Sequence, residues 1–239
     1  MLIFGHRGFS GKYPENTMLS FSKAVEAGAH GIELDVHLTK DGKPVIIHDE
    51  SLKRTTGMDG NVNDYYFDDI VKINAGKTFD DKHGFTPIPS LDEYCSYISK
   101  TDVVTNIEIK TNLFYYPNIE EIVVDFVKRY DLVEKVIISS FNWVSVLRTK
   151  SLMPELECGL LQETYLQQNA GLLAKSCKVE YFHPDIRLMN DFIVKDCKDN
   201  GIGINSWTIN TEEQFKTALK WNFRAAITNY PDLGLSLIN

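Results

Sequence analysis

Three carboxylates stand inside short apolar runs of this chain, where an isolated charge is costly to bury. Glu33 and Asp35 lie one residue apart in the run 31–36, and Glu108 lies in the run 104–109. Because side chains of a strand alternate between its faces, Glu33 and Asp35 point the same way. Three carboxylates in one pocket repel each other unless a cation lies between them. Oxygen ligands favour Mg²⁺ or Ca²⁺, with Mn²⁺ possible, so the pattern predicts one divalent metal ion at these residues.

Two histidines are placed to act beside this metal site. His6 follows the first apolar run, and His48 ends a predicted hairpin. An imidazole that titrates near pH ~6.5 can give or take a proton at neutral pH. Phosphodiester cleavage needs both a base and an acid, each contributing ~10²- to 10⁴-fold. We therefore expect His6 and His48 to be this pair, in an order that the sequence leaves open. The other histidines lack such neighbours and are interpreted as structural, with His183 left open because it follows the sixth run: His30, His37, His83 and His183.

Positive charge and two further polar or aromatic residues accompany the pair. Arg7 and Lys110 can hold phosphoryl oxygens, Arg7 through its bidentate fork and Lys110 as a point charge. The alternative for these charges is a surface salt-bridge network with the carboxylates. Trp207 either forms the floor of the pocket or belongs to the core. Asn16 either caps the first helix or hydrogen-bonds into the pocket.

The elements that must position these residues are parallel strands. Apolar runs that predict eight strands alternate with amphipathic stretches that predict helices at 17–27, 119–130, 142–151, 190–199 and 211–220. The strands are expected at 2–4, 31–36, 104–109, 136–139, 158–161, 179–182, 203–207 and 225–228. This alternation favours a TIM (β/α)8 barrel, with an open doubly wound sheet as the alternative. A barrel would place the charged residues together at the carboxyl ends of its strands.

One interval is too long for a single crossover, because roughly seventy residues separate the second and third strands. It begins with a hairpin over 36–48, in which Asp41 and Gly42 favour a two-residue type I′ turn. That register places Asp35 opposite His48. The polar, aromatic stretch at about 49–89 is predicted to form a small inserted subdomain over the barrel mouth. The whole chain, 1–239, is then one domain.

Composition restricts the partners. Among 239 residues, 25 are Lys or Arg and 33 are Asp or Glu, a formal net charge of -8, which opposes binding to long nucleic acids. The 4 cysteines have neither zinc-site spacing nor the density of a disulfide scaffold. No signal peptide or membrane span is evident. A cytoplasmic protein of unknown oligomeric state is therefore expected.

Taken together, these motifs resemble the glycerophosphodiester phosphodiesterase family over nearly the whole chain. The matching blocks are HRGFSGKYPENT, GIELDVHLTKDGKPVIIHDESLKRTTGMDG, IPSLDEY, NIEIK, ISSF, INSWTIN and TNYPDL. The resemblance implies a TIM barrel with an inserted subdomain. It also implies roles for single residues: Glu33, Asp35 and Glu108 as metal ligands, His6 and His48 as acid and base, Arg7 and Lys110 as phosphate contacts, and Trp207 in the pocket. Asn229 departs from the family, which usually has Asp there, and this puts a local contact in doubt.

The implied reaction is metal-dependent hydrolysis of a glycerophosphodiester to sn-glycerol 3-phosphate and an alcohol. One alternative is a lysophospholipase D-like or sphingomyelinase D-like phosphodiesterase, for which the five aromatic residues of the insertion would suit a lipid surface. Another is a catalytically inactive member that only binds ligand. Such a member would have lost a histidine or carboxylate of the motif, and none is missing here.

Overall fold

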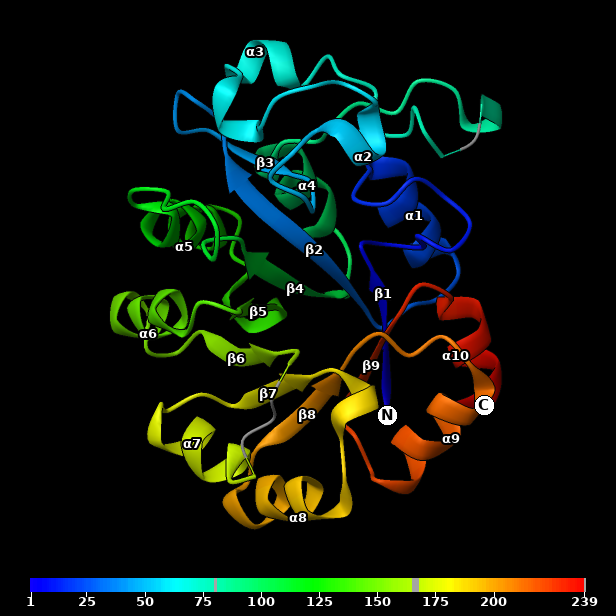
Figure 1. Ribbon diagram of the computed structural model, residues 1–239, viewed down its shortest axis with the longest axis vertical. Helices are drawn as coiled ribbons and strands as arrows, with labels where there is room; N and C mark the ends of the chain where they lie inside the picture. The colour runs from blue at the N-terminus through cyan, green and yellow to red at the C-terminus, as the bar shows by residue number, and fades with distance from the viewer. Residues whose placement is uncertain (80, 165–167, 239) are drawn as a thin grey trace.

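A computed structural model of the protein describes residues 1–79, 81–164 and 168–238. Within these residues, eight parallel strands form a closed barrel with helices around it (Figure 1). Their bounds are β1 Leu2–His6, β2 Gly31–Leu38, β4 Val104–Ile109, β5 Val136–Ser140, β6 Glu157–Gln162, β7 Tyr181–Pro184, β8 Gly203–Ser206 and β9 Ala225–Thr228. Pairing of β1 with both β2 and β9 closes the barrel. The predicted TIM barrel is confirmed, and the open sheet is wrong.

Strand side chains alternate between an outer, apolar layer and the barrel interior. On β2, Ile32 and Leu34 pack outward into the large core beneath the helices. Gly31 faces inward, and a Cβ atom there would lie 2.3 Å from the ring of Phe4. Phe4 belongs to a separate interior cluster with Ile137, Tyr181, Ala225 and Ile227. The interior is therefore filled by apolar side chains on one level, and polar groups occupy the strand ends above it.

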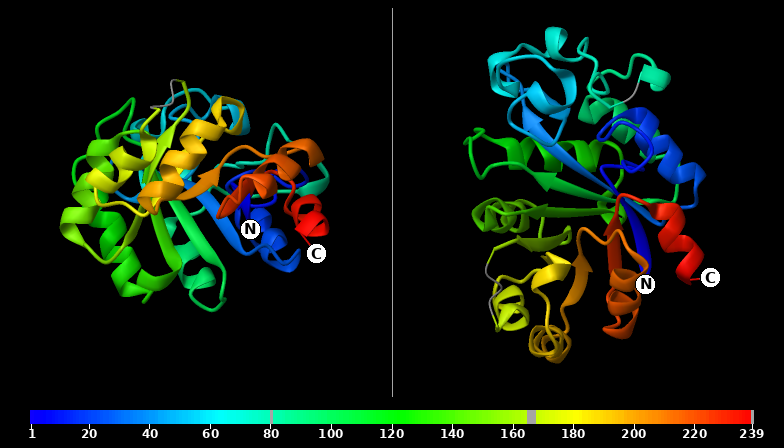
Figure 2. Two further views of the ribbon diagram at one scale, coloured as in Figure 1. Left: turned by 90° about the horizontal axis from the view of Figure 1, so that it is seen from below. Right: turned by 45° about the vertical axis from the view of Figure 1, so that its right-hand side comes forward.

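The helices form the outer ring (Figure 2). Their bounds are α1 Met18–Glu26, α4 Leu91–Ile98, α5 Ile119–Arg129, α6 Trp143–Leu152, α7 Ala170–Ser176, α8 Asp191–Asn200, α9 Glu212–Lys220 and α10 Pro231–Ile238, with short 3₁₀ turns η3 Val133–Lys135 and η4 Ile186–Leu188. Side-chain caps begin several of them: the Thr17 hydroxyl accepts from Ser20 N, and that of Ser90 from Glu93 N. The five predicted helices are present, whereas α4, α7 and α10 were not predicted.

The hairpin after β2 differs from its predicted register by one residue. β3, Pro44–Ile46, pairs antiparallel to β2 with Val36 opposite Ile46. The turn spans one residue more than expected: Thr39 N donates to Lys43 O at 2.9 Å, and Gly42 adopts a left-handed φ of 73°. A type I turn followed by a left-handed glycine forms such a bulged loop. The predicted pairing of Asp35 with His48 is therefore wrong, and the main chain of Asp35 contacts Ile47 instead.

The insertion folds around its own small core. It contains α2 Lys53–Thr56, η1 Val62–Asp64, α3 Phe67–Ile70 and η2 Asp81–His83. Its buried side chains form a cluster separate from the barrel core: Val45, Ile47, Leu52, Val62, Ile70, Ile73, Ala75 and Ile88. Figure 1 shows this part beyond the end of β2 and beside β3. The inserted subdomain expected after the second strand is therefore present, beside the strand ends that carry the site.

The helices and the cysteines of the described chain bear on membrane insertion and on disulfide formation. No helix in the part of the chain that the structure describes is long and apolar enough to cross a membrane. The thiols Cys95, Cys158, Cys177 and Cys197 are all free. Burial raises the pKa of Cys95 and of Cys158 to about 12, so these thiols stay protonated.

Candidate active site

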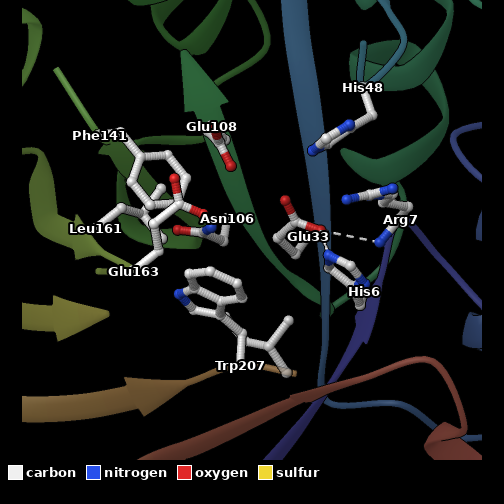
Figure 3. A pocket seen from close by; sticks show the side chains of 11 residues that line it. His6, Arg7, Glu33, His48, Asn106, Glu108, Phe141, Leu161, Glu163 and Trp207 are labelled. Carbon is white, nitrogen blue, oxygen red and sulfur yellow. Dashed lines mark hydrogen bonds and ion pairs between the residues drawn. The ribbon is translucent and has the colours of Figure 1, made fainter. Parts of the chain in front are cut away.

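A cavity of about 430 Å³, its open mouth included, lies at the carboxyl ends of the barrel strands. Figure 3 shows the histidines on one side of it and an aromatic wall on the other. Its lining residues lie in or directly after β1, β2, β4, β5, β6, β8 and β9, or in the hairpin: His6, Arg7, Glu33, His48, Asn106, Glu108, Phe141, Leu161, Glu163, Trp207 and Ile227.

The three predicted carboxylates converge at this cavity. Glu33 and Asp35 lie on the inner face of β2, and Asp35 is the register neighbour of Glu108 on β4. One oxygen from each lies within 4.8 Å of the others, and all three residues are buried. Burial, with repulsion from Asp35 and Glu108, raises the pKa of Glu33 well above its usual range. Burial likewise raises the pKa of Glu108. Such a cluster is unfavourable without a cation.

Two cations lie against the carboxylates. The Lys110 Nζ atom is 2.9 Å from Glu108 Oε1 and 3.5 Å from Asp35 Oδ1, and Lys110 is 5% exposed. Burial lowers its pKa, but Glu108 and Asp35 more than compensate and raise it. Arg7 Nε is 3.5 Å from Asp35 Oδ2, and its backbone N–H donates to Glu33 Oε2 at 2.9 Å. Burial raises the pKa of Asp35, but His48, Lys110 and Arg7 hold it below its usual range.

His6 is held from behind by Asn229, the residue that directly follows the last barrel strand. Its Nδ1 atom lies 2.7 Å from Asn229 Oδ1, and since that oxygen can only accept, Nδ1 carries the proton. The other nitrogen, Nε2, is left on the cavity side, 3.9 Å from Glu33 Oε2. Burial, with the nearby charge of Arg7, lowers the pKa of His6 to about 3. The ring is therefore neutral and presents a lone pair to the cavity.

His48 is held by a carboxylate rather than an amide. Its Nδ1 atom lies 2.5 Å from Asp49 Oδ1. Asp49 Oδ2 accepts from Arg54 Nε at 2.6 Å, and Arg54 also binds Glu15, which pairs with Arg7 at 2.9 Å. Figure 3 shows the His48 ring directed toward Glu33 and Arg7. An ionic network therefore connects the residue behind His48 to the arginine beside His6.

The remaining predicted residues have defined partners. Asn16 is buried, and its Nδ2 donates to Asp35 Oδ2 at 2.8 Å, so it contacts the carboxylate cluster, while Thr17 caps α1. The Trp207 indole lines the cavity, and its N–H donates to His183 O at 2.9 Å. The His183 ring lies inside the barrel below the cavity, where its Nε2 accepts from Asn205 at 3.0 Å. His183 is therefore structural.

Five cavity residues were not predicted: Asn106, Phe141, Leu161, Glu163 and Ile227. Asn106 stands two positions before Glu108, on the same face of β4, and is the register neighbour of Glu33. Phe141 and Glu163 follow the ends of β5 and β6 directly. The period-two rule, extended two residues past each predicted strand, would have found all five.

Comparison with known proteins identifies the family. The family model "Glycerophosphoryl diester phosphodiesterase family" matches residues 6–233. The chain belongs to this family. It is 39% identical over 237 residues to a glycerophosphodiester phosphodiesterase of Caldanaerobacter subterraneus subsp. tengcongensis, covering 99% of this chain and 97% of that one. It is 25% identical to human lysophospholipase D GDPD1 over 95% of this chain and 82% of that one.

A solved structure of a related phosphodiesterase gives the same fold. The Oleispira antarctica enzyme, in complex with the product sn-glycerol-3-phosphate, superposes with a TM-score of 0.90 and 28% identity, over 100% of this chain and 96% of that one. The family membership and the enzyme class predicted from the sequence, a phosphoric diester hydrolase, are therefore confirmed.

Proposed function

We propose that this member of the glycerophosphodiester phosphodiesterase family hydrolyses soluble glycerophosphodiesters to sn-glycerol 3-phosphate and an alcohol. One observation carries the proposal: three buried carboxylates lie within 4.8 Å of one another, and two of them, Glu33 and Glu108, line one cavity together with two histidines. The product bound to the Oleispira antarctica relative supports the glycerol 3-phosphate part.

The carboxylates fit a divalent ion. Asp35 Oδ1 is buried and accepts no hydrogen bond among the described residues. Glu33, Asp35 and Glu108 would therefore hold one Mg²⁺ or Ca²⁺, with Mn²⁺ also suited, since these ions prefer oxygen ligands. When bound, such an ion stabilises negative charge on phosphoryl oxygens.

The two histidines divide the proton transfers. His6 is neutral and presents its Nε2 lone pair, so it accepts a proton from the nucleophile that attacks phosphorus, and water supplies the oxygen that the product phosphate gains. His48 is held by Asp49 through Nδ1, which leaves its other nitrogen for the substrate, so it gives a proton to the departing alcohol. Arg7 lines the cavity beside them and holds the phosphoryl oxygens. Lys110 is buried between Asp35 and Glu108, and it offsets their charge beneath the phosphate.

Charge favours one small phosphodiester as substrate. With a divalent ion, Arg7 and Lys110 offset the three carboxylates and leave roughly one net positive charge at the cavity. A phosphodiester group carries a single negative charge, which neutralises it. A nucleic acid would bring many more charges to a protein whose formal net charge is -8. The Trp207 indole forms the apolar side of the cavity, where it packs against the substrate carbons.

We propose that residues 1–239 form a single catalytic domain with an insertion at about 49–89. Arg54 of the insertion binds Glu15 and Asp49, which supports a role for the insertion in holding the site. The four free thiols support a reducing compartment, such as the cytoplasm.

Activity measurements test the function directly. The enzyme, with Mg²⁺, Ca²⁺ or Mn²⁺, is incubated with glycerophosphocholine, glycerophosphoethanolamine or glycerophosphoglycerol, and glycerol 3-phosphate is detected with a coupled dehydrogenase. We expect turnover that EDTA abolishes, and a fall in kcat of ~10²-fold or more for His6→Ala and for His48→Ala. A p-nitrophenyl leaving group needs no proton, so with such a substrate the defect of His48→Ala should shrink.

Two results would contradict the proposal. Full activity in EDTA, with no metal on the purified protein, would remove the metal from the reaction. Inactivity on all three diesters, with efficient release of choline from lysophosphatidylcholine, would favour the lysophospholipase D-like alternative.

A further inference from the structure

A second histidine of β2 contacts the main chain of His48. His37 is fully buried, and its Nε2 atom lies 3.0 Å from the backbone oxygen of His48. Its other nitrogen, Nδ1, lies 3.0 Å from the hydroxyl of Tyr116, which follows β4 and is 4% exposed. The Tyr116 ring meets the His37 ring edge-on, with the centroids 5.7 Å apart. His37 is therefore held between a tyrosine and the chain segment that carries His48.

The chemistry of the partners fixes the direction of both hydrogen bonds. A backbone carbonyl only accepts, so His37 Nε2 carries a proton and donates it to His48 O. Burial favours the neutral ring, which leaves a lone pair on Nδ1. The Tyr116 hydroxyl therefore donates to His37, and each polar atom of the ring is satisfied.

The chain at His48 needs this support because it has left the sheet. β3 ends at Ile46, and the last main-chain bond to β2 runs from Ile47 N to Asp35 O. Beyond that point, His37 holds the carbonyl of His48, while Asp49 holds its ring through Nδ1. Two contacts at different atoms define both the position and the rotation of the imidazole.

We propose that His37, oriented by Tyr116, is a positioning residue that keeps the His48 imidazole aligned for proton transfer. This inference rests on the catalytic role of His48 proposed above. A displacement of about 1 Å at a reacting group lowers the rate by ~10²-fold. The contacted oxygen is only three bonds from the His48 Cβ, so loss of this contact should lower kcat. The contact lies outside the cavity, so it has little effect on substrate binding.

Single substitutions separate positioning from folding. His37→Gln keeps an N–H at a similar reach, and its kcat should stay within about threefold of wild type. His37→Leu removes the donor and should lower kcat by about 10- to 100-fold, with KM changed less than twofold. Tyr116→Phe keeps the ring and should lower kcat by about three- to tenfold. Tyr94→Phe is the matched control, since it removes a buried tyrosine hydroxyl bonded to Thr105 on the outer face of β4.

A double-mutant cycle with His48→Ala tests whether His37 affects catalysis through His48. If His37 acts through His48, His37→Leu or Tyr116→Phe should cause no further loss of kcat in the His48→Ala background. Equal losses in both backgrounds, or a loss in Tyr94→Phe as large as in Tyr116→Phe, would overturn the inference and leave the proposed function intact. Full activity of His48→Ala alone would overturn the catalytic role of His48 and this inference with it.

Discussion

Replacing Glu33 with glutamine should stabilise the metal-free protein while removing its activity. At 4.8 Å and an effective dielectric constant of about 20, two carboxylates repel by roughly 3 kcal/mol. Arg7 and Lys110 offset much of this repulsion. We therefore expect Glu33→Gln to raise the free energy of unfolding in EDTA by about 1–3 kcal/mol. The glutamine amide oxygen still accepts the Arg7 N–H, so no hydrogen bond is lost.

Thermal unfolding with and without metal measures this effect. For a domain of this size, the expected gain corresponds to a rise of about 3–8 °C in the midpoint in EDTA. Metal at about one hundred times its Kd stabilises the wild type by about 2.7 kcal/mol, and the variant, which lacks one of three ligands, should gain less. When metal is added, the unfolding midpoints of the wild type and of Glu33→Gln should therefore become equal or change order. The kcat of the variant should fall to that of the chelated wild type.

The control is Glu134→Gln, at an exposed carboxylate of η3, which should change the unfolding free energy by less than about 0.5 kcal/mol. A lower midpoint for Glu33→Gln in EDTA would refute the idea that the cluster stores repulsion. Equal stabilisation of both proteins by metal would refute the role of Glu33 as a ligand.

Two further predictions concern the barrel interior and the insertion. Burial, with the charge of Arg224, lowers the pKa of His183 to about 3, so the folded state excludes a proton that the unfolded state binds below pH ~6.5. The contribution of the neutral His183 to stability is therefore fully present above that pH and is lost as the pH falls. Between pH 8 and pH 5, denaturant unfolding should show a decrease in the unfolding free energy that is about 2 kcal/mol smaller in His183→Gln than in the wild type. Equal decreases in both proteins would contradict this prediction. Ile70→Ala removes a fully buried side chain from the separate core of the insertion and should lower the free energy of unfolding of the insertion by about 2–5 kcal/mol. Hydrogen exchange should then rise in residues 49–89 and stay low in β5; an equal rise in both would mean that they unfold together.

The fold was predictable because most strands and helices show a pattern of apolar residues in their own sequence. The apolar run at 104–109 coincides with β4, and the predicted helix 211–220 differs from α9 by one residue. The missed α7 is short, and α10 is apolar over most of its length, so neither gives a clear amphipathic period. The hairpin register failed because Asp-Gly suits both a two-residue turn and a bulged three-residue loop, and the Thr39 side chain, which accepts from Lys43 N, favours the second.

The residues of the candidate site were predictable where the alternation of side chains along a strand alone determines which way a side chain points. Glu33 and Asp35 were expected on one face, and both point inward. Contacts that depend on loops gave no such signal: Asp49 behind His48, and Tyr116 behind His37, lie beyond strand ends. His37 was interpreted as structural because no carboxylate adjoins it in sequence, and only the folded hairpin brings it to the carbonyl of His48.

The hydrogen bond between His6 and Asn229 joins residues 223 positions apart and crosses the seam between β1 and β9. During synthesis, the three carboxylates and both histidines emerge within the first 108 residues. The partner that fixes the proton of His6 on Nδ1 comes from the segment after the final strand. A chain that lacks this segment would therefore hold every residue of the proposed site but not the contact that sets the proton of His6. The proposed proton acceptor is thus complete only when the first and last strands of the barrel have paired.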